Sequence, residues 1–178
     1  TVRAAGMPGQ LATATDHETG PERLGGLAAG RPRSTTGAMK ILFCNYEYPP
    51  LGGGGGVINA LLAEELAKRH EVSILTSCAM DLEPTETRKG VRIVRVPVPF
   101  RRHMAAANIP SLLGFVIQGI HHGRELVRRE RPDVINTHFA LPSGPVGDRL
   151  AREIGCPNIL SVHGGDLYDP SKWTSPHR

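Results

Sequence analysis

Short apolar runs alternate with helix-like segments along most of this chain, and this alternation limits the fold more than any other feature. The apolar runs read as strands at residues 41–44, 71–77, 90–99, 133–138 and 157–165. Helical patterns at residues 57–70, 110–131 and 143–155 lie between most of them. The pattern predicts an α/β fold, a Rossmann-like doubly wound, mostly parallel sheet with right-handed crossovers and strand order 3-2-1-4-5.

The predicted helices show apolar periodicity and recognisable ends. Positive charge at residues 68–70 suits a helix C-terminus, Pro110 suits a helix start, and Gly155 suits a helix stop. In the segment 57–70, four large apolar side chains share one helix face: Ile58, Leu61, Leu62 and Leu66.

Residues 1–38 differ in composition from the rest of the chain. They are rich in Gly, Ala, Thr, Pro and Arg and have few large apolar side chains, so we expect a disordered extension. Met39 opens the patterned part abruptly, and we interpret it as the natural start of the domain at 39–178.

Charge and cysteine content exclude several classes of function. The 178 residues carry a formal charge of +4 and only 4% aromatic residues, which argues against a nucleic-acid partner. The number of cysteines is odd, and the three, Cys44, Cys78 and Cys156, are far apart in the sequence. We therefore expect buried thiols in a reducing, cytoplasmic setting. No stretch is long and apolar enough to suggest a membrane span, and no His, Cys or carboxylate spacing suggests a metal site.

Three loops should meet at one edge of this sheet. In a doubly wound sheet, ligands bind beyond the carboxyl ends of the strands where the winding reverses, which is here between the first and fourth strands. The glycine run after the first strand, His138 after the fourth and the "HGGD" segment after the fifth all follow such ends.

The stretch "YPPLGGGGG" fits neither common nucleotide loop. Val57 and Ile58 stand where G-x-G-x-x-G needs its third glycine, and no Lys-Ser or Lys-Thr follows as in a P-loop. The second strand also ends in Thr76 and Ser77 rather than in an acid that would bind ribose. Two interpretations stay open, a close-approach turn that binds an anion at a helix N-terminus and a flexible turn without a ligand.

The histidines can also be interpreted as either functional or structural residues. His138 is either a functional side chain at the switch point or a satisfied structural residue. His163 and Asp166 either line a ligand site or form a tight turn with a capping aspartate. His121 and His122 are adjacent on a predicted helix and read as surface residues.

Three segments together resemble a known family. "MKILFCNYEYPPLGGGGGVINALLAEELAKRHEVSILTS", "RPDVINTHFALPSG" and "PNILSVHGGDLYDP" are similar, in order and spacing, to landmarks of the group 1 (family 4) retaining glycosyltransferases. The resemblance covers roughly residues 39–170 and implies the amino-terminal, Rossmann-like half of a GT-B fold. Arg69, where the family often has glycine, and the long glycine run depart from the usual pattern.

The resemblance implies a role for each loop. A nucleotide-diphosphate sugar would be the donor substrate, with no metal and no separate cofactor. His138 would lie near the reacting sugar, and His163, Gly164 and Asp166 would line the cleft where substrate binds. The donor diphosphate would be approached by the glycine run, that is Gly52, Gly53, Gly54, Gly55 and Gly56.

The implied activity is transfer of a hexosyl group to a polysaccharide, a lipid-linked acceptor or a small glycoside. The family's second domain, with its E-x7-E motif, is not found here, so we expect a fragment that is inactive alone. The alternatives are a non-catalytic nucleotide- or partner-binding module and, less supported by the motifs, a dinucleotide-dependent oxidoreductase. The basic stretch 101–131 is either a helix that covers the sheet or a segment that contacts the inner face of a membrane.

Overall fold

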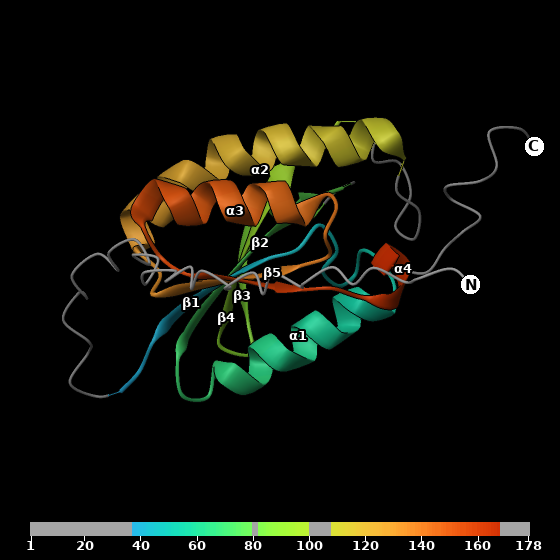
Figure 1. The fold of residues 1–178 in the computed structure, drawn as a ribbon. Coiled ribbons are helices and arrows are strands. Elements are labelled where there is room, and N and C mark those ends of the chain that lie inside the picture. The colour runs from blue at the N-terminus through green and yellow to red at the C-terminus, as the bar shows by residue number, and fades with distance from the viewer. Residues whose placement is uncertain (1–36, 80–81, 100–107, 168–178) are drawn as a thin grey trace, which may run out of the picture. The chain divides into compact units, whose positions relative to one another are not determined.

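Six strands form one sheet in the computed structural model, which describes residues 37–79, 82–99 and 108–167 (Figure 1). The sheet order is β3-β4-β2-β1-β5-β6, and all pairs except β3–β4 are parallel. The strands are β1 (Lys40–Cys44), β2 (Glu71–Cys78), β3 (Thr85–Arg88), β4 (Val91–Pro97), β5 (Val134–His138) and β6 (Asn158–Ser161).

The predicted order of the five parallel strands is confirmed, because β4, β2, β1, β5 and β6 follow one another in the expected sequence. The additional edge strand β3 was not predicted. Its sequence, TETR, has no apolar run, and it forms because it pairs with β4 across a two-residue turn at Lys89 and Gly90. Arg95 of β4, whose side chain is buried, reinforces this pairing with an ion pair to Glu86 of β3 at 2.5 Å.

Helices cover both faces of the sheet. Figure 1 shows α2 (Ile109–Glu130) and α3 (Ser143–Ile154) side by side on one face and α1 (Gly54–Leu66) on the other. Side chains of β1 alternate between these layers. Leu42 and Cys44 join the core beneath α2 and α3, whereas Ile41 and Phe43 join the core beneath α1. A strand buried on both faces therefore reads as a continuous apolar run in the sequence.

Helix α1 differs from its prediction in bounds and orientation. It begins at Gly54, within the glycine run, and ends at Leu66, before the basic residues. The large apolar side chains of its predicted face are mostly outside, since Ile58 is 55% and Leu61 is 61% exposed. Small residues face the sheet instead and let the helix lie close to it: Gly56, Asn59, Ala60 and Ala63.

Helices α2 and α3 agree with their predictions more closely. The Asn108 side chain accepts a hydrogen bond from the Ser111 N–H at 2.8 Å and caps α2. Gly155 ends α3 in the left-handed conformation, as expected for a helix stop. On α2, Gly119 and Gly123 lie against Val146 and Leu150 of α3, so the two helices pack closely.

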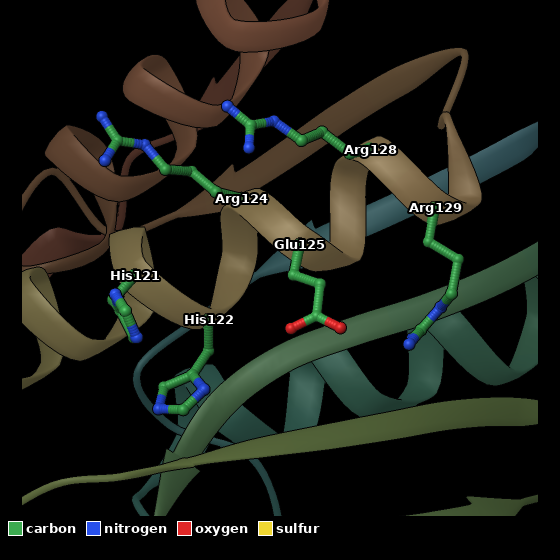
Figure 2. Close-up of a pocket in the computed structure, with 6 residues that line it drawn as sticks. All are labelled: His121, His122, Arg124, Glu125, Arg128 and Arg129. Carbon is green, nitrogen blue, oxygen red and sulfur yellow. The ribbon is translucent and has the colours of Figure 1, made fainter.

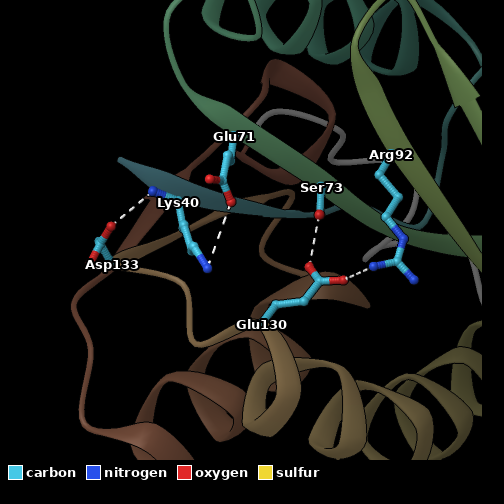
Figure 3. Close-up of polar contacts among 6 residues, drawn as sticks. All are labelled: Lys40, Glu71, Ser73, Arg92, Glu130 and Asp133. Atoms are coloured by element: carbon cyan, nitrogen blue, oxygen red, sulfur yellow. Dashed lines mark hydrogen bonds and ion pairs between the residues drawn. The ribbon is translucent and has the colours of Figure 1, made fainter. Parts of the chain in front are cut away.

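The amino ends of the strands are tied together by polar contacts (Figure 3). The Asp133 carboxylate, just before β5, accepts a hydrogen bond from the Lys40 N–H of β1 at 2.8 Å. Glu130, at the end of α2, accepts a hydrogen bond from Ser73 of β2 at 2.8 Å and pairs with Arg92 of β4. Polar groups at this edge are therefore satisfied within the protein.

Some sequence predictions lie outside the described residues. These are the extension at residues 1–38, apart from Gly37 and Ala38, and residues 101–107 of the basic stretch 101–131.

Candidate functional site

The carboxyl ends of β1, β5 and β6 lie at one edge of the sheet. Cys44 at the end of β1 is opposite Thr137 of β5, and His138 is opposite Ser161 of β6. The chain passes from β1 to β2 on one side and returns to β5 on the other, so the winding reverses between β1 and β5 as predicted. The glycine run, His138 and the "HGGD" segment therefore follow neighbouring strand ends.

The glycine run is not one continuous loop. Gly54, Gly55 and Gly56 form the first turn of α1, and Gly53 is the N-cap residue, whose carbonyl accepts from the Gly56 and Val57 N–H groups. This differs from a turn that contains all five glycines. The helix starts here because backbone N–H groups of the first turn donate hydrogen bonds to the Gly53 carbonyl, although no side chain caps the helix.

The glycines fall into two groups by what surrounds them. A Cβ atom on Gly52, whose φ is +95°, would lie 2.5 Å from Glu47, and a Cβ atom on Gly55 would lie 2.3 Å from the Phe139 ring. A Cβ atom on Gly56 would make a tight contact with the Leu51 carbonyl oxygen at 3.3 Å. A Cβ atom on Gly53 or Gly54, in contrast, would have no atom of the described residues within 4 Å. Only these two glycines leave room for a ligand to approach the backbone.

Glu47 lies at the N-terminus of α1. Its Oε2 atom accepts a hydrogen bond from the Gly53 N–H at 3.1 Å. A carboxylate is favourable at this end of a helix, because the unpaired N–H groups carry partial positive charge. An anionic ligand at Gly53 would therefore compete with Glu47 for the same N–H group.

The segment after β1 is held in place by its neighbours. The Tyr46 N–H donates to Ser143 Oγ at the start of α3 at 2.9 Å, and the Tyr46 carbonyl accepts from Ser77 Oγ at 2.6 Å and from Thr76 Oγ1 at 3.4 Å. Thr76 and Ser77 lie near the end of β2, where a dinucleotide site would place an acid. Their hydroxyl groups bind the protein backbone here and fix the path of the loop.

His138 and His163 form the centre of the edge. The Nδ1 atom of His138 lies 3.1 Å from the Nε2 atom of His163, and the two rings stack with centroids 5.2 Å apart. The Phe139 ring lies 4.5 Å from that of His163. Because Phe139 also contacts Gly55, its ring connects the glycine run to the histidine pair.

Phe139 adopts an uncommon backbone conformation, with φ at +71°. A bulky side chain in the left-handed region costs about 1–3 kcal/mol and often marks a functional site. The Phe139 N–H donates to the Ser161 carbonyl at 3.0 Å, which holds the turn against β6.

Several buried side-chain polar atoms have no hydrogen-bond partner among the described residues, and two of them belong to residues at the carboxyl ends of β5 and β1. These two are the Nε2 atom of His138 and the Nδ2 atom of Asn45; the Tyr48 hydroxyl and the Asn59 amide are others. A buried polar group without a partner costs about 1–3 kcal/mol, which makes Asn45 and His138 candidates for contact with a ligand. Burial first, and then the charge of His163, lower the pKa of His138 to about 4, so its ring is neutral near pH 7.

Comparisons with known proteins agree with this geometry. Residues 53–178 match the family model described as "Glycosyl transferase 4-like domain". An uncharacterized glycosyltransferase of Methanocaldococcus jannaschii is 32% identical over 131 residues, which are 72% of this chain and 33% of that protein.

The chain belongs to the glycosyl transferase 4-like domain family.

More distant relatives show the same pattern of coverage. Glycogen synthase of Mycobacterium tuberculosis is 26% identical over 151 residues, which are 77% of this chain and 36% of that protein. Sucrose-phosphate synthase of Thermosynechococcus elongatus shares the fold, with a TM-score of 0.57 and 17% identity over 75% of this chain and 37% of that one. The glycosyltransferase domain described here thus spans about a third of the length of the curated relatives it matches.

In this glycosyltransferase domain the "HGGD" segment is a short helix rather than the end of a strand. Strand β6 ends at Ser161, and Gly164–Leu167 form α4. The Asp166 carboxylate accepts a hydrogen bond from the His163 N–H at 3.0 Å, so it caps this turn. Gly164 is exposed and has open space around it. His163 therefore reaches the His138 ring, whereas the Asp166 carboxylate binds the backbone.

Asn45, Glu47 and Phe139 were not among the predicted site residues. Asn45 had a usable signal, since an amide directly after a buried apolar strand falls at the carboxyl edge. Glu47 and Phe139 had none, because their contacts with Gly52, Gly53 and Gly55 depend on the folded loop.

A separate hollow of about 530 Å³ lies on the outer surface of α2 (Figure 2). Arg124 and Arg128 from this surface reach Glu153 of α3. His121 and His122 are exposed there, as predicted, with rings at 83° to each other. The hollow is lined by His121, His122, Arg124, Glu125, Arg128 and Arg129, none of which belongs to the carboxyl edge.

Two further observations concern the described ranges only. None of their helices combines the length and the apolar composition that crossing a bilayer requires. Within the same ranges, no three His, Cys, Asp or Glu side chains are grouped so that they could hold a metal ion.

Proposed function

We propose that this chain is the acceptor-side domain of a retaining glycosyltransferase that moves a hexosyl group from a nucleotide-diphosphate sugar to an acceptor. The observation that supports this most is the buried Nε2 atom of His138, which has no partner in the described part of the chain and lies at the strand edge that also bears the accessible glycines. The chain belongs to a glycosyltransferase family. The acceptor is a polysaccharide, a lipid-linked sugar or a small glycoside.

Within this proposal, Gly53 and Gly54 approach the donor diphosphate. Their backbones are accessible, and they stand at the N-terminus of a thirteen-residue helix, where anions are favoured. The Glu47 carboxylate occupies the Gly53 N–H group in this structure and would have to move when phosphate binds. The other three glycines serve the packing of the loop against Glu47, Leu51 and Phe139.

His138 lies near the reacting sugar in this proposal. Its ring is neutral near pH 7 because burial disfavours the charged form, so it acts as a hydrogen-bonding group and not as a cation. The donor sugar is a substrate, and no cofactor or metal takes part in the proposed reaction.

We infer that the donor nucleotide is bound mainly by a second domain. The curated relatives are about three times as long as the segment they share with this chain. On this view the 178-residue chain does not transfer sugar by itself.

The test is a donor screen with a protein that joins this chain to a second, nucleotide-binding domain. UDP-, GDP-, ADP- and dTDP-linked hexoses are supplied with sugar acceptors, and release of the nucleoside diphosphate is measured. We expect turnover with one donor class and loss of turnover for His138→Leu, with His121→Leu on the exposed surface of α2 as the control. Binding of nucleotide without transfer to any acceptor would favour the non-catalytic module instead.

A second proposal concerns location. The outer face of α2 carries three exposed apolar side chains at four-residue spacing: Ile109, Leu113 and Ile117. Farther along the helix, the single carboxylate of Glu153 pairs with three arginines, Arg124, Arg128 and Arg149 of α3. One carboxylate cannot neutralise three guanidinium groups, so this cluster is positively charged. An apolar row beside positive charge suits the surface of an anionic membrane, so we propose a cytoplasmic protein in peripheral contact with the inner leaflet.

Vesicle co-sedimentation tests this contact. We expect binding to vesicles that contain phosphatidylglycerol, weaker binding to phosphatidylcholine alone, and loss of binding for Ile117→Glu. The matched control is Leu61→Glu, an equally exposed apolar residue of α1 on the other face of the sheet. Equal sedimentation with both lipids, or equal loss in both variants, would contradict the proposal.

A further inference from the structure

The contact between His138 and His163 joins two ring nitrogens, and a hydrogen bond between them needs one proton. Their separation of 3.1 Å is a normal hydrogen-bond distance, so one ring donates and the other accepts. We propose that His163 is a positioning residue: it accepts a hydrogen bond from His138 Nδ1–H and thereby leaves His138 Nε2 unprotonated, as the acceptor that faces the ligand.

The direction of this bond follows from the burial of His138. If His163 donated instead, the proton of His138 would sit on Nε2, which is buried and has no partner among the described residues. An unpaired N–H is the rarer and more costly kind of buried polar group. A bare Nε2 atom is the less costly alternative. His163 is only half-buried, so its own Nδ1–H can reach water.

Neighbouring residues hold the His138 and His163 rings in position. Phe43 packs against His138 from the core, with centroids 5.7 Å apart, and Phe139 packs against His163. Asp166 accepts the His163 N–H and fixes the backbone from which that ring projects. The left-handed turn at Phe139 is thus part of what keeps the two imidazoles in contact.

This arrangement has a consequence for ligand chemistry, and that consequence rests on the proposed function. An unprotonated Nε2 atom accepts a hydrogen bond from a hydroxyl group, but it cannot donate one to a phosphate oxygen. His138 would therefore recognise a sugar hydroxyl, while the phosphates are left to Gly53 and Gly54. Because burial lowers the pKa of His138, its ring holds only one proton near pH 7, and the hydrogen bond to His163 places that proton on Nδ1.

The protonation of each nitrogen can be read from long-range ¹H–¹⁵N NMR of the ¹⁵N-histidine-labelled chain at neutral pH. We expect a protonated Nδ1 and a bare Nε2 at His138 in the unchanged chain. In His163→Ala the Nδ1–H group of His138 loses its acceptor, so a mixture of both tautomers should replace the single Nδ1–H form. The pKa of His138 should also rise, because one cause of its depression is gone. His163→Gln supplies an acceptor oxygen near the former Nε2 position, so it should restore the tautomer.

His121→Ala is the matched control, since His121 is exposed on α2 and belongs to the separate hollow. It should leave the spectrum of His138 unchanged. A proton on His138 Nε2 in the unchanged chain, or the same tautomer with and without His163, would overturn the inference. The test needs neither donor nor acceptor, so its failure is distinct from failure of the donor screen.

Discussion

The amino and carboxyl edges of the sheet differ in whether their polar groups have hydrogen-bond partners. At the amino edge, Asp133 and Glu130 bind groups from β1, β2 and β4, and each contact closes within the protein (Figure 3). At the carboxyl edge, Asn45 Nδ2 and His138 Nε2 are buried and have no partner among the described residues, and Phe139 is held in a left-handed turn. The first edge therefore stabilises the fold, and we propose that the second gives up stability because its polar groups serve a ligand.

The largest expected effect comes from His138 at the carboxyl edge. His138→Leu keeps much of the side-chain volume but removes both ring nitrogens, so sugar transfer by the two-domain protein should fall by about 100-fold or more. The free energy of unfolding of the chain should change by about 1 kcal/mol or less, because loss of the hydrogen bond to His163 is offset by removal of the buried Nε2 atom, which has no partner among the described residues. Steady-state kinetics and urea unfolding measure the two quantities. A large loss of stability with unchanged kcat would assign His138 to the fold.

A pair of glycine variants separates ligand approach from packing. Gly54→Val places its side chain in open space, so we expect roughly tenfold weaker binding of the donor with little change in stability. Gly55→Val would meet the Phe139 ring, and it should lower the free energy of unfolding by about 1–3 kcal/mol. Calorimetric binding and chemical unfolding give the comparison. Equal donor affinity in Gly54→Val and the unchanged protein would show that the phosphates lie elsewhere.

The amino edge should respond in the opposite sense. Glu130→Ala removes the acceptor for Ser73 and the partner of Arg92, so it should lower the free energy of unfolding by about 1–2 kcal/mol. Sugar transfer should stay the same at a temperature where the variant is folded. Exposed Glu65 of α1, which pairs with Lys68 across one helical turn, is the control, and Glu65→Ala should cost much less. Reduced turnover by folded Glu130→Ala would mean that the edges are not independent.

A fourth expected effect is a pH dependence of stability that belongs to His138. Its pKa is about 4 in the folded chain and near 6.5 when unfolded, so the unfolded chain binds the proton first as pH falls. Stability should therefore be lost between about pH 6.5 and pH 4. In His138→Leu that part of the loss should be absent, and urea unfolding at several pH values measures it. An identical pH profile in both proteins would show that His138 is not the group responsible.

The sequence predicts the parallel part of the fold because that part depends on local patterns. A strand buried on both faces appears as the apolar run Ile41–Cys44, and the order of such strands follows from connection rules. The orientation of α1 could not be predicted in this way. Its small residues, such as Ala60 and Ala63, occupy the buried face because they let the helix approach the sheet closely. This close packing outweighs the periodicity of the large apolar side chains.

The candidate site is predictable to the level of which edge carries it. Topology alone brings His138, His163 and the glycine run to the same edge. It does not tell which glycines pack inward, because Glu47 and Phe139 decide this through contacts that form only in the folded loop. The direct contact between the two histidines likewise depends on the backbone turn at Phe139.

The most direct measurement is an NMR titration of the two-domain protein labelled with ¹⁵N at glycine and histidine. UDP-glucose, GDP-mannose and ADP-glucose serve as donors, each at millimolar concentration. We expect a binding donor to shift the Gly53 and Gly54 amides and the His138 ring nitrogens, while His121 and His122 on α2 stay unchanged. Shifts confined to His121 and His122, or none at any glycine or histidine with all three donors, would contradict the assignment of the carboxyl edge as the ligand site.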